Sequence, residues 1–142
     1  MFKLRKKQMK KLSAMVVAMG MCIATTGMTA QAGATASFNF TVKTSGSKGT
    51  ASSETATKTA STDYAVIHVG SISNNSYGVW LRVDKGTASS RSVATSEQKF
   101  TGIATKNSYY KSGMKSVGSS YVAVGRLPDG APNITVKGYE TP

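Results

Sequence analysis

Hydrophobic and polar residues alternate in several short segments of this chain, and each such segment predicts a β-strand. Phe38, Phe40 and Val42 are separated by single polar residues, which is the period of a strand with one buried face. The same alternation returns at residues 121–127 and 134–139. No segment beyond the first 32 residues keeps the ~3.6-residue period of an amphipathic helix, so we expect an all-β fold.

The strongest strand segments are residues 64–72 and 77–83, which are rich in Val, Ile and aromatic residues. Only four residues separate them, and Asn tolerates the positive φ angle that a tight hairpin turn needs. We therefore expect an antiparallel hairpin with Asn74 and Asn75 at its turn. The expected register pairs Ile72 with Tyr77, Gly70 with Val79, His68 with Leu81, and Val66 with Val83.

Stretches of Ser, Thr, Gly and Ala separate the strand segments and predict turns and loops. We expect loops at residues 45–53, 85–92 and 106–115, a polar edge strand at 55–61 and a short strand around Phe100. Six or seven short strands with turns between them predict a small antiparallel β-sandwich, and a small open barrel is the alternative.

The first 32 residues have the layout of a secretory signal peptide. Six Lys and Arg residues lie among the first 12, and an apolar stretch follows at 12–26. This stretch is shorter than the ~20 residues of a membrane-spanning helix. Ala30 and Ala32 are the small residues that a signal peptidase accepts before its cleavage site. We expect cleavage after Ala32, an extracellular location, and a single secreted β domain at residues 33–142.

Charge and cysteine content both change once the expected signal peptide is removed. The 142-residue chain carries a net charge of +12, of which +6 stays with residues 33–142. Its only cysteine, Cys22, belongs to the signal peptide, so we expect no disulfide in the exported chain. A basic exported protein attracts anionic polymers and surfaces. Cell-wall polymers, glycans and membrane surfaces are therefore the expected partners, and the sequence contains no nucleic-acid-binding motif.

The residues needed for common catalytic and metal sites are scarce in this sequence. His68 is the only histidine, and the expected hairpin places it beside Leu81, so triads and histidine metal clusters lack a well-placed base or further ligands. The acidic residues are scattered singly, whereas a glycosidase needs two carboxylates about 5–10 Å apart. We expect no enzyme activity, no cofactor and no metal. A small secreted hydrolase stays open as a further function class, after the two that are given below. The acidic residues are Glu54, Asp63, Asp84, Glu97, Asp129 and Glu140.

A surface that binds a ligand is the chemistry that the sequence does offer. Trp80 lies on the expected hairpin, and Arg82 follows on the same face of the strand. Aromatic rings bind sugar faces or cations, and a guanidinium beside a ring can hold an anion. Tyr109 and Tyr110 are flanked by lysines and offer a second surface of this kind. These four residues form the candidate ligand platform.

Three strand segments carry a resemblance to known proteins: Ala-Ser-Phe-Asn-Phe-Thr-Val-Lys at 36–43, Tyr-Ala-Val at 64–66, and Ile-Thr-Val-Lys-Gly-Tyr at 134–139. With the signal peptide before them, they resemble a group of small secreted β-proteins of Gram-positive bacteria that has no established activity. We expect a secreted, non-enzymatic β-sandwich whose surface binds anionic polymers or glycans of the cell envelope. The cysteine-free basic domain is also remotely similar to lactococcin-type bacteriocins, which implies an antimicrobial protein as the alternative.

The expected processing can be measured directly on exported protein. Small residues at Ala30 and Ala32 predict that the exported chain begins at Gly33. Mass spectrometry of protein recovered from culture medium checks the mass and the first residue. An Ala32→Tyr variant is the matched control, because a bulky side chain before the cut should block cleavage. An exported wild-type chain that still begins at Met1 would contradict the assignment.

Overall fold

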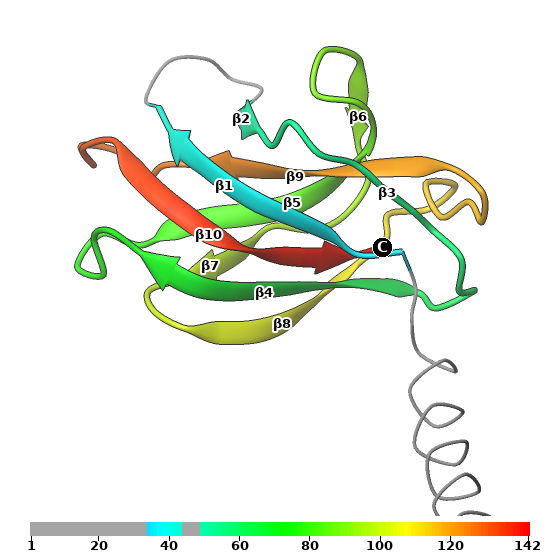
Figure 1. The fold of residues 1–142 in the computed structure, drawn as a ribbon, viewed down its shortest axis with the longest axis horizontal. Coiled ribbons are helices and arrows are strands. Elements are labelled where there is room, and N and C mark those ends of the chain that lie inside the picture. The colour runs from blue at the N-terminus through cyan, green and yellow to red at the C-terminus, as the bar shows by residue number, and fades with distance from the viewer. Residues whose placement is uncertain (1–33, 44–48) are drawn as a thin grey trace, which may run out of the picture. The chain divides into compact units, whose positions relative to one another are not determined.

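The computed structural model describes residues 34–43 and 49–142. Within these residues all regular structure is β, so the all-β prediction is confirmed (Figure 1). The predicted signal peptide and the first part of the expected 45–53 loop lie outside the described residues. The strands are β1 (Ala36–Val42), β2 (Thr50–Ala51), β3 (Ala56–Thr57), β4 (Tyr64–Ile72), β5 (Val79–Gly86), β6 (Arg91–Val93), β7 (Gln98–Phe100), β8 (Ala104–Tyr109), β9 (Ser120–Arg126) and β10 (Ile134–Thr141).

Four antiparallel strands form the first sheet, sheet A, in the order β1-β10-β4-β8. Its inward positions are the alternate hydrophobic residues that the sequence pattern identifies. Phe38 and Val42 on β1 are at most 3% exposed, and Ala65, Ile67 and Val69 on β4 are fully buried. The residues between them point to the opposite side, so the outer face of sheet A is open to solvent.

The second sheet, sheet B, is built around the long strands β9 and β5, which pair with each other. The short strands β2 and β3 both pair with β9 at its other edge, and β6 and β7 both pair with β5. Each pair of short strands therefore acts as one interrupted edge strand. The interruption between β6 and β7, at residues 94–97, shapes the site described below.

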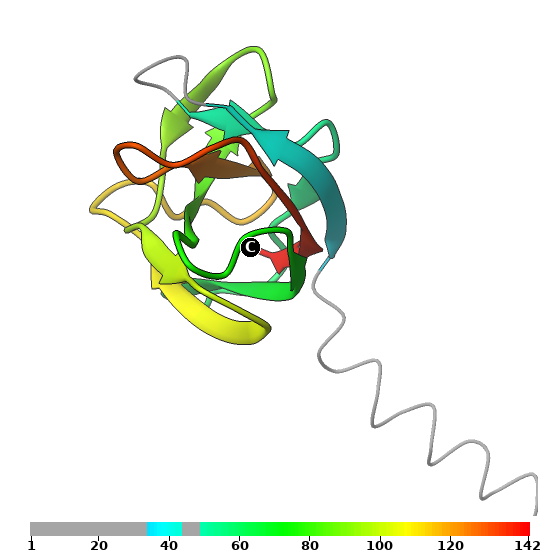
Figure 2. The same cartoon turned by 90° about the vertical axis from the view of Figure 1, so that its left-hand side faces the viewer.

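The two sheets come into close contact at Gly125, where β1 packs against β9. A Cβ atom at this glycine would lie 2.5 Å from Cγ2 of Val42 and 3.0 Å from the ring of Phe40. One of the sheets curls into a half-barrel, as the end-on view in Figure 2 shows. The architecture is consistent with both the small sandwich and the open barrel that the sequence predicts.

The predicted hairpin between residues 64–72 and 77–83 is wrong. Both segments are strands, but β4 belongs to sheet A and β5 to sheet B. The Asn74 side chain accepts backbone N–H bonds from Ser76 (3.1 Å) and Tyr77 (3.3 Å), and Gly78 has the positive φ of 71°. This turn carries the chain from one sheet to the other. The hairpin prediction failed because strand periodicity identifies the inward face of a strand but not the sheet that the strand joins.

Two predicted loops contain strands instead. Residues 85–92 continue β5 to Gly86 and return along β6, and residues 106–115 begin with the second half of β8. The described residues form ten strands instead of the expected six or seven, and several of these are only two or three residues long. The predicted strand near Phe100 is present as β7, whereas the polar edge strand expected at 55–61 is reduced to β3.

A carboxyl group lies inside the core at Glu140, near the end of β10. Glu140 is 1% exposed, and neither carboxyl oxygen has a hydrogen-bond partner among the described residues. Burial raises the pKa of Glu140 to about 8; the nearby backbone of Ala123 opposes this shift and the charge of Asp84 adds to it. The folded protein therefore holds this carboxyl group protonated at neutral pH.

The Gly125→Ala substitution tests the close approach of the sheets. The added methyl group would overlap Val42 and Phe40, and forced overpacking of this kind costs about 1–3 kcal/mol. Gly102→Ala is the matched control, because nothing lies within 4 Å of the position that its added methyl group would take. We expect the control to be neutral or stabilising by up to about 1 kcal/mol. Thermal and urea unfolding measure both changes, and equal melting temperatures for the two variants would argue against the contact.

The Glu140→Gln substitution tests the buried acid through the pH dependence of stability. Because the pKa of Glu140 is raised from 4.5 to about 8 in the folded protein, the free energy of unfolding is unaffected by this group below pH 4.5. It decreases as pH rises from 4.5 toward 8, because the unfolded chain then loses this proton more readily than the folded protein does. The loss is at most about 1.4 kcal/mol for each pH unit of that interval. We expect Glu140→Gln to match the wild type at pH 4 and to melt higher at pH 9. Glu54 is exposed, so the control variant Glu54→Gln should melt at the wild-type temperature at every pH. If Glu140→Gln also melts at the wild-type temperature at every pH, the raised pKa of Glu140 is contradicted.

Candidate functional site

The site lies on the outer face of sheet B, where the edge strand along β5 is interrupted. The register pairs Leu81 with Gln98 and Asp84 with Val93, so residues 94–97 lie opposite only two residues of β5. Extra residues in one strand of a pair form a bulge, which re-aims the side chains it contains. Here the bulge directs the side chains of Thr95 and Glu97 back toward β5.

Thr95 fixes the bulge in place. Its N–H donates to the Val83 carbonyl (3.0 Å), and its Oγ1 accepts from the Val83 N–H (2.9 Å). Ser108 on β8 donates its hydroxyl to the same Oγ1 at 2.9 Å. A side-chain hydroxyl thus supplies the bond that a regular ladder would have made with a backbone carbonyl, and Thr95 is fully buried. The position of Glu97, two residues further on, follows from this anchor.

Arg82 is the centre of a cluster of opposite charges. It points outward from β5 yet is only 6% exposed. Its Nε and Nη2 donate to the two carboxylate oxygens of Asp84, at 2.7 and 3.2 Å, and its Nη1 donates to Glu97 at 2.9 Å. Burial alone would lower the pKa of Arg82, but the hydrogen bonds and charges of Asp84 and Glu97 outweigh it and raise the pKa.

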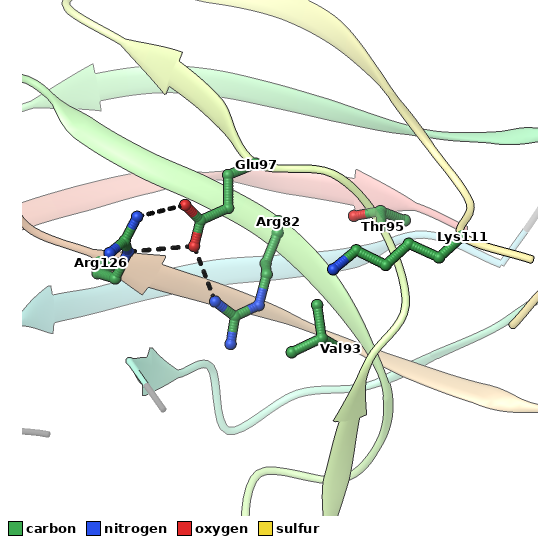
Figure 3. Close-up of a pocket in the computed structure, with 6 residues that line it drawn as sticks. All are labelled: Arg82, Val93, Thr95, Glu97, Lys111 and Arg126. Atoms are coloured by element: carbon green, nitrogen blue, oxygen red, sulfur yellow. Dashed lines mark hydrogen bonds and ion pairs between the residues drawn. The ribbon is translucent and has the colours of Figure 1, made fainter. Parts of the chain in front are cut away.

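Glu97 is held from two sides. Arg126 at the end of β9 donates from Nε to one carboxylate oxygen (3.1 Å) and from Nη2 to the other (2.6 Å), while Arg82 binds the first of these oxygens (Figure 3). Burial would raise the pKa of Glu97, but the bonds from Arg126 and Arg82 lower it overall. The carboxylate is therefore ionised at neutral pH. On the other side of the cluster, Arg91 places its Nε 3.4 Å from Asp84.

A hollow of about 440 Å³ opens beside this cluster. Lys111 reaches into it from the side opposite Arg126, so cationic groups face each other across the space (Figure 3). Among the described residues, the Lys111 ammonium and Nη1 of Arg126 have no ion-pair or hydrogen-bond partner. The hollow is lined by Arg82, Val93, Thr95, Glu97, Lys111 and Arg126.

A second hollow of about 220 Å³ adjoins the first and shares Arg126 with it. Lys43 and Asp129 bring one charge of each sign to this second hollow. Each of the two hollows contains one acidic residue, and Glu97 is bound to two arginines. Neither hollow therefore holds the pair of carboxylates that the hydrolase hypothesis needs.

The four residues of the predicted platform do not come together. Trp80 and Arg82 lie on β5, where Trp80 is half-buried with the Lys99 ammonium 5.9 Å from its ring centre. Tyr109 is 58% exposed and packs against Tyr64 on sheet A. The Tyr110 ring packs against Tyr121 instead, with its centre 4.6 Å from the Lys58 ammonium. Of the four, only Arg82 lines the larger hollow.

Sequence reasoning missed most residues of the site. One signal was available, because Arg82 and Asp84 are two positions apart and so share a face of any strand. No local pattern links them to Glu97, which arrives through the bulge, or to Arg126, which the register places opposite Trp80. Lys111 was visible only as a neighbour of Tyr110.

His68 and the remaining polar groups offer no metal site in the described part of the chain. His68 lies on the outer face of sheet A, where its Nδ1 is hydrogen-bonded to the Thr105 hydroxyl (2.7 Å). Residues 34–43 and 49–142 contain no group of three His, Cys, Asp or Glu side chains placed to hold a metal ion. They also contain no helix long and apolar enough to span a membrane.

Comparison of the chain with protein-family models, with curated proteins and with solved structures finds no match. Function must therefore be argued from the chemistry of the molecule itself. We take as the candidate site the two adjoining hollows, one on the outer face of sheet B and one at the end of β9, because cationic groups line both of them.

Proposed function

We propose that the protein is a secreted, non-enzymatic β-sandwich that binds an anionic polymer of the cell envelope through the hollows on sheet B. The observation that carries the proposal is the charge of the larger hollow, whose lining includes three cationic residues and one carboxylate. The net positive potential of such a hollow attracts phosphate or carboxylate groups. The net charge of +6 on residues 33–142 adds a long-range attraction of the same sign.

Arg126 and Lys111 supply the groups that would touch the ligand. The Arg126 side chain is 51% exposed, and its Nη1 is available after Nε and Nη2 have bound Glu97. An arginine has five N–H donors in a planar fork, so one guanidinium can bind two anions at once. Lys111 adds a mobile point charge from the other side of the hollow.

Glu97 gives the hollow a built-in counter-ion. Without ligand, it holds the Arg82 and Arg126 guanidinium groups in fixed positions. An anionic ligand must share these groups with Glu97, which limits the affinity for any single anion. A polymer with regularly repeated anionic groups overcomes this limit, because the second hollow and Lys43 lie next to the first and share Arg126.

Binding to poly(glycerol phosphate) tests the proposal. We expect binding at low ionic strength that weakens steeply between about 50 and 200 mM salt, since exposed charges are screened over a Debye length of ~10 Å at 0.1 M. Arg126→Ala and Lys111→Ala should each weaken binding about threefold to tenfold through the loss of a charge-assisted hydrogen bond. Calorimetry or fluorescence anisotropy gives the affinities, and thermal melts confirm that each variant is folded.

Lys137→Ala is the matched control, because Lys137 is exposed on β10 in the other sheet and its loss changes the net charge equally. This variant should bind nearly as well as the wild type. If Lys137→Ala and Lys111→Ala weaken binding equally, attraction by the overall charge explains the data and the hollow is not a site. Absence of binding to the polymer at low salt would refute the proposed function.

A further inference from the structure

The outer face of sheet A differs in chemistry from the arginine cluster on sheet B. Antiparallel pairing places its outward side chains in rows that cross the strands, and each row is about 7 Å from the next. The four strands lie side by side in Figure 1. From the register, the first row is Ser37, Tyr139, His68 and Thr105; the second is Thr141, Val66 and Asn107; the third is Tyr64 and Tyr109.

Aromatic pairs occupy the first and third rows. The rings of Tyr139 and His68 are stacked, with centres 4.7 Å apart and planes 21° apart. The rings of Tyr64 and Tyr109 meet edge to face, with centres 5.8 Å apart. Tyr139 is 39% and Tyr109 58% exposed, so each pair presents ring surface to solvent. Ring–ring contact and the bond from His68 to Thr105 hold these side chains in place before any ligand arrives.

The middle row has no aromatic ring and carries hydrogen-bonding groups. Val66 is half-buried between the two aromatic pairs, with Asn107 and Thr141 beside it on the neighbouring strands. The Thr141 hydroxyl is hydrogen-bonded to the Thr35 hydroxyl at 3.0 Å. An amide and hydroxyl groups therefore lie between two aromatic surfaces. His68 and Tyr64 are four residues apart on β4, which separates the aromatic pairs by about 13 Å.

No residue in these three rows is Lys, Arg, Asp or Glu. The neighbouring row on the same face contains the exposed Lys137, so the uncharged area is limited to these three rows, and it contrasts with the ion pairs on the outer face of sheet B. An uncharged face suits an uncharged ligand, because no charge has to be desolvated without a partner on binding.

We propose that this face of sheet A is a second binding site, which takes a glycan chain of uncharged sugar rings. A sugar ring has an apolar C–H face and a rim of hydroxyl groups, so it matches aromatic surfaces that flank an amide and hydroxyl groups. The distance between the aromatic pairs requires a ligand longer than one ring. The site is independent of the anion-binding hollows, since it shares no residue with them.

A protein partner or a second copy of the chain fits this face less well. The three rows contain one aliphatic side chain, Val66, whereas stable protein interfaces have a contiguous apolar centre. Tyr, Ser, Thr, Asn and His form the rest of the rows, and these side chains combine ring surface with hydrogen-bonding groups. The composition favours a polar ligand with apolar faces.

Titration with neutral hexasaccharides tests the inference. The probes are β-1,4-linked glucose, β-1,4-linked N-acetylglucosamine and α-1,4-linked glucose hexamers, with the matching monosaccharides. We expect at least one hexamer to bind more tightly than its monosaccharide. Tyrosine fluorescence, or NMR shifts of residues in the three rows, measures this binding. Tyr109→Ala and Tyr139→Ala should each weaken binding about threefold to tenfold, because each removes an exposed ring from one aromatic pair.

Two control variants make the result specific. Tyr77→Ala removes a tyrosine of similar exposure (42%) from the connection between the sheets and should leave hexamer binding unchanged. Arg126→Ala should also leave it unchanged, while it weakens binding to poly(glycerol phosphate). The experiments therefore distinguish a failure of the glycan-binding proposal from a failure of the proposed function.

Three results would overturn the inference. The first is that no hexamer binds at millimolar concentration. The second is that a hexamer binds but Tyr109→Ala and Tyr139→Ala bind it as well as the wild type does. The third is concentration-dependent dimerisation that Tyr109→Ala abolishes, measured by sedimentation, which would assign the face to a second copy of the chain.

Discussion

The burial of the Arg82 guanidinium is the constraint on which the outer face of sheet B depends. A charge this far from solvent is tolerated only when it is paired and hydrogen-bonded. Asp84 supplies two bonds from the same strand, and Glu97 supplies the third from the bulge. Because Glu97 also binds Arg126, the pairing of one buried charge links side chains from β5, the bulge and the end of β9.

The two outer faces divide the surface chemistry of the domain between them. Arginine, lysine and carboxylate groups surround two hollows beside the outer face of sheet B and the end of β9, whereas three rows of sheet A have mainly aromatic, hydroxyl and amide groups and no charged side chain. A sandwich allows this division because each sheet has one face in the common core and one in solvent. The two proposed sites therefore place anionic groups and uncharged sugar rings on opposite sides of one small domain.

Local patterns in the sequence located the strands β1, β4, β5, β9 and β10, but they missed β6 and most of β8 and were insufficient for the site. The alternation at Phe38, Phe40 and Val42 is local, and β1 is where it predicts. Sheet membership depends on contacts between distant segments, so the paired interpretation of residues 64–72 and 77–83 failed although both are strands. The site failed for the same reason, because Arg82, Glu97 and Arg126 come from separate segments that only the register brings together.

Under the proposed function, Glu97 also sets how the hollow discriminates among anions. Its carboxylate occupies the bidentate position on Arg126 that a single phosphate or carboxylate would take. A lone anion therefore gains only the groups that Glu97 leaves available, chiefly Nη1 of Arg126 and the Lys111 ammonium. A polymer gains the same modest contacts at each successive charge, and tethering makes the later contacts intramolecular. The internal carboxylate thus favours polymeric anions over the small anions that are abundant in solution.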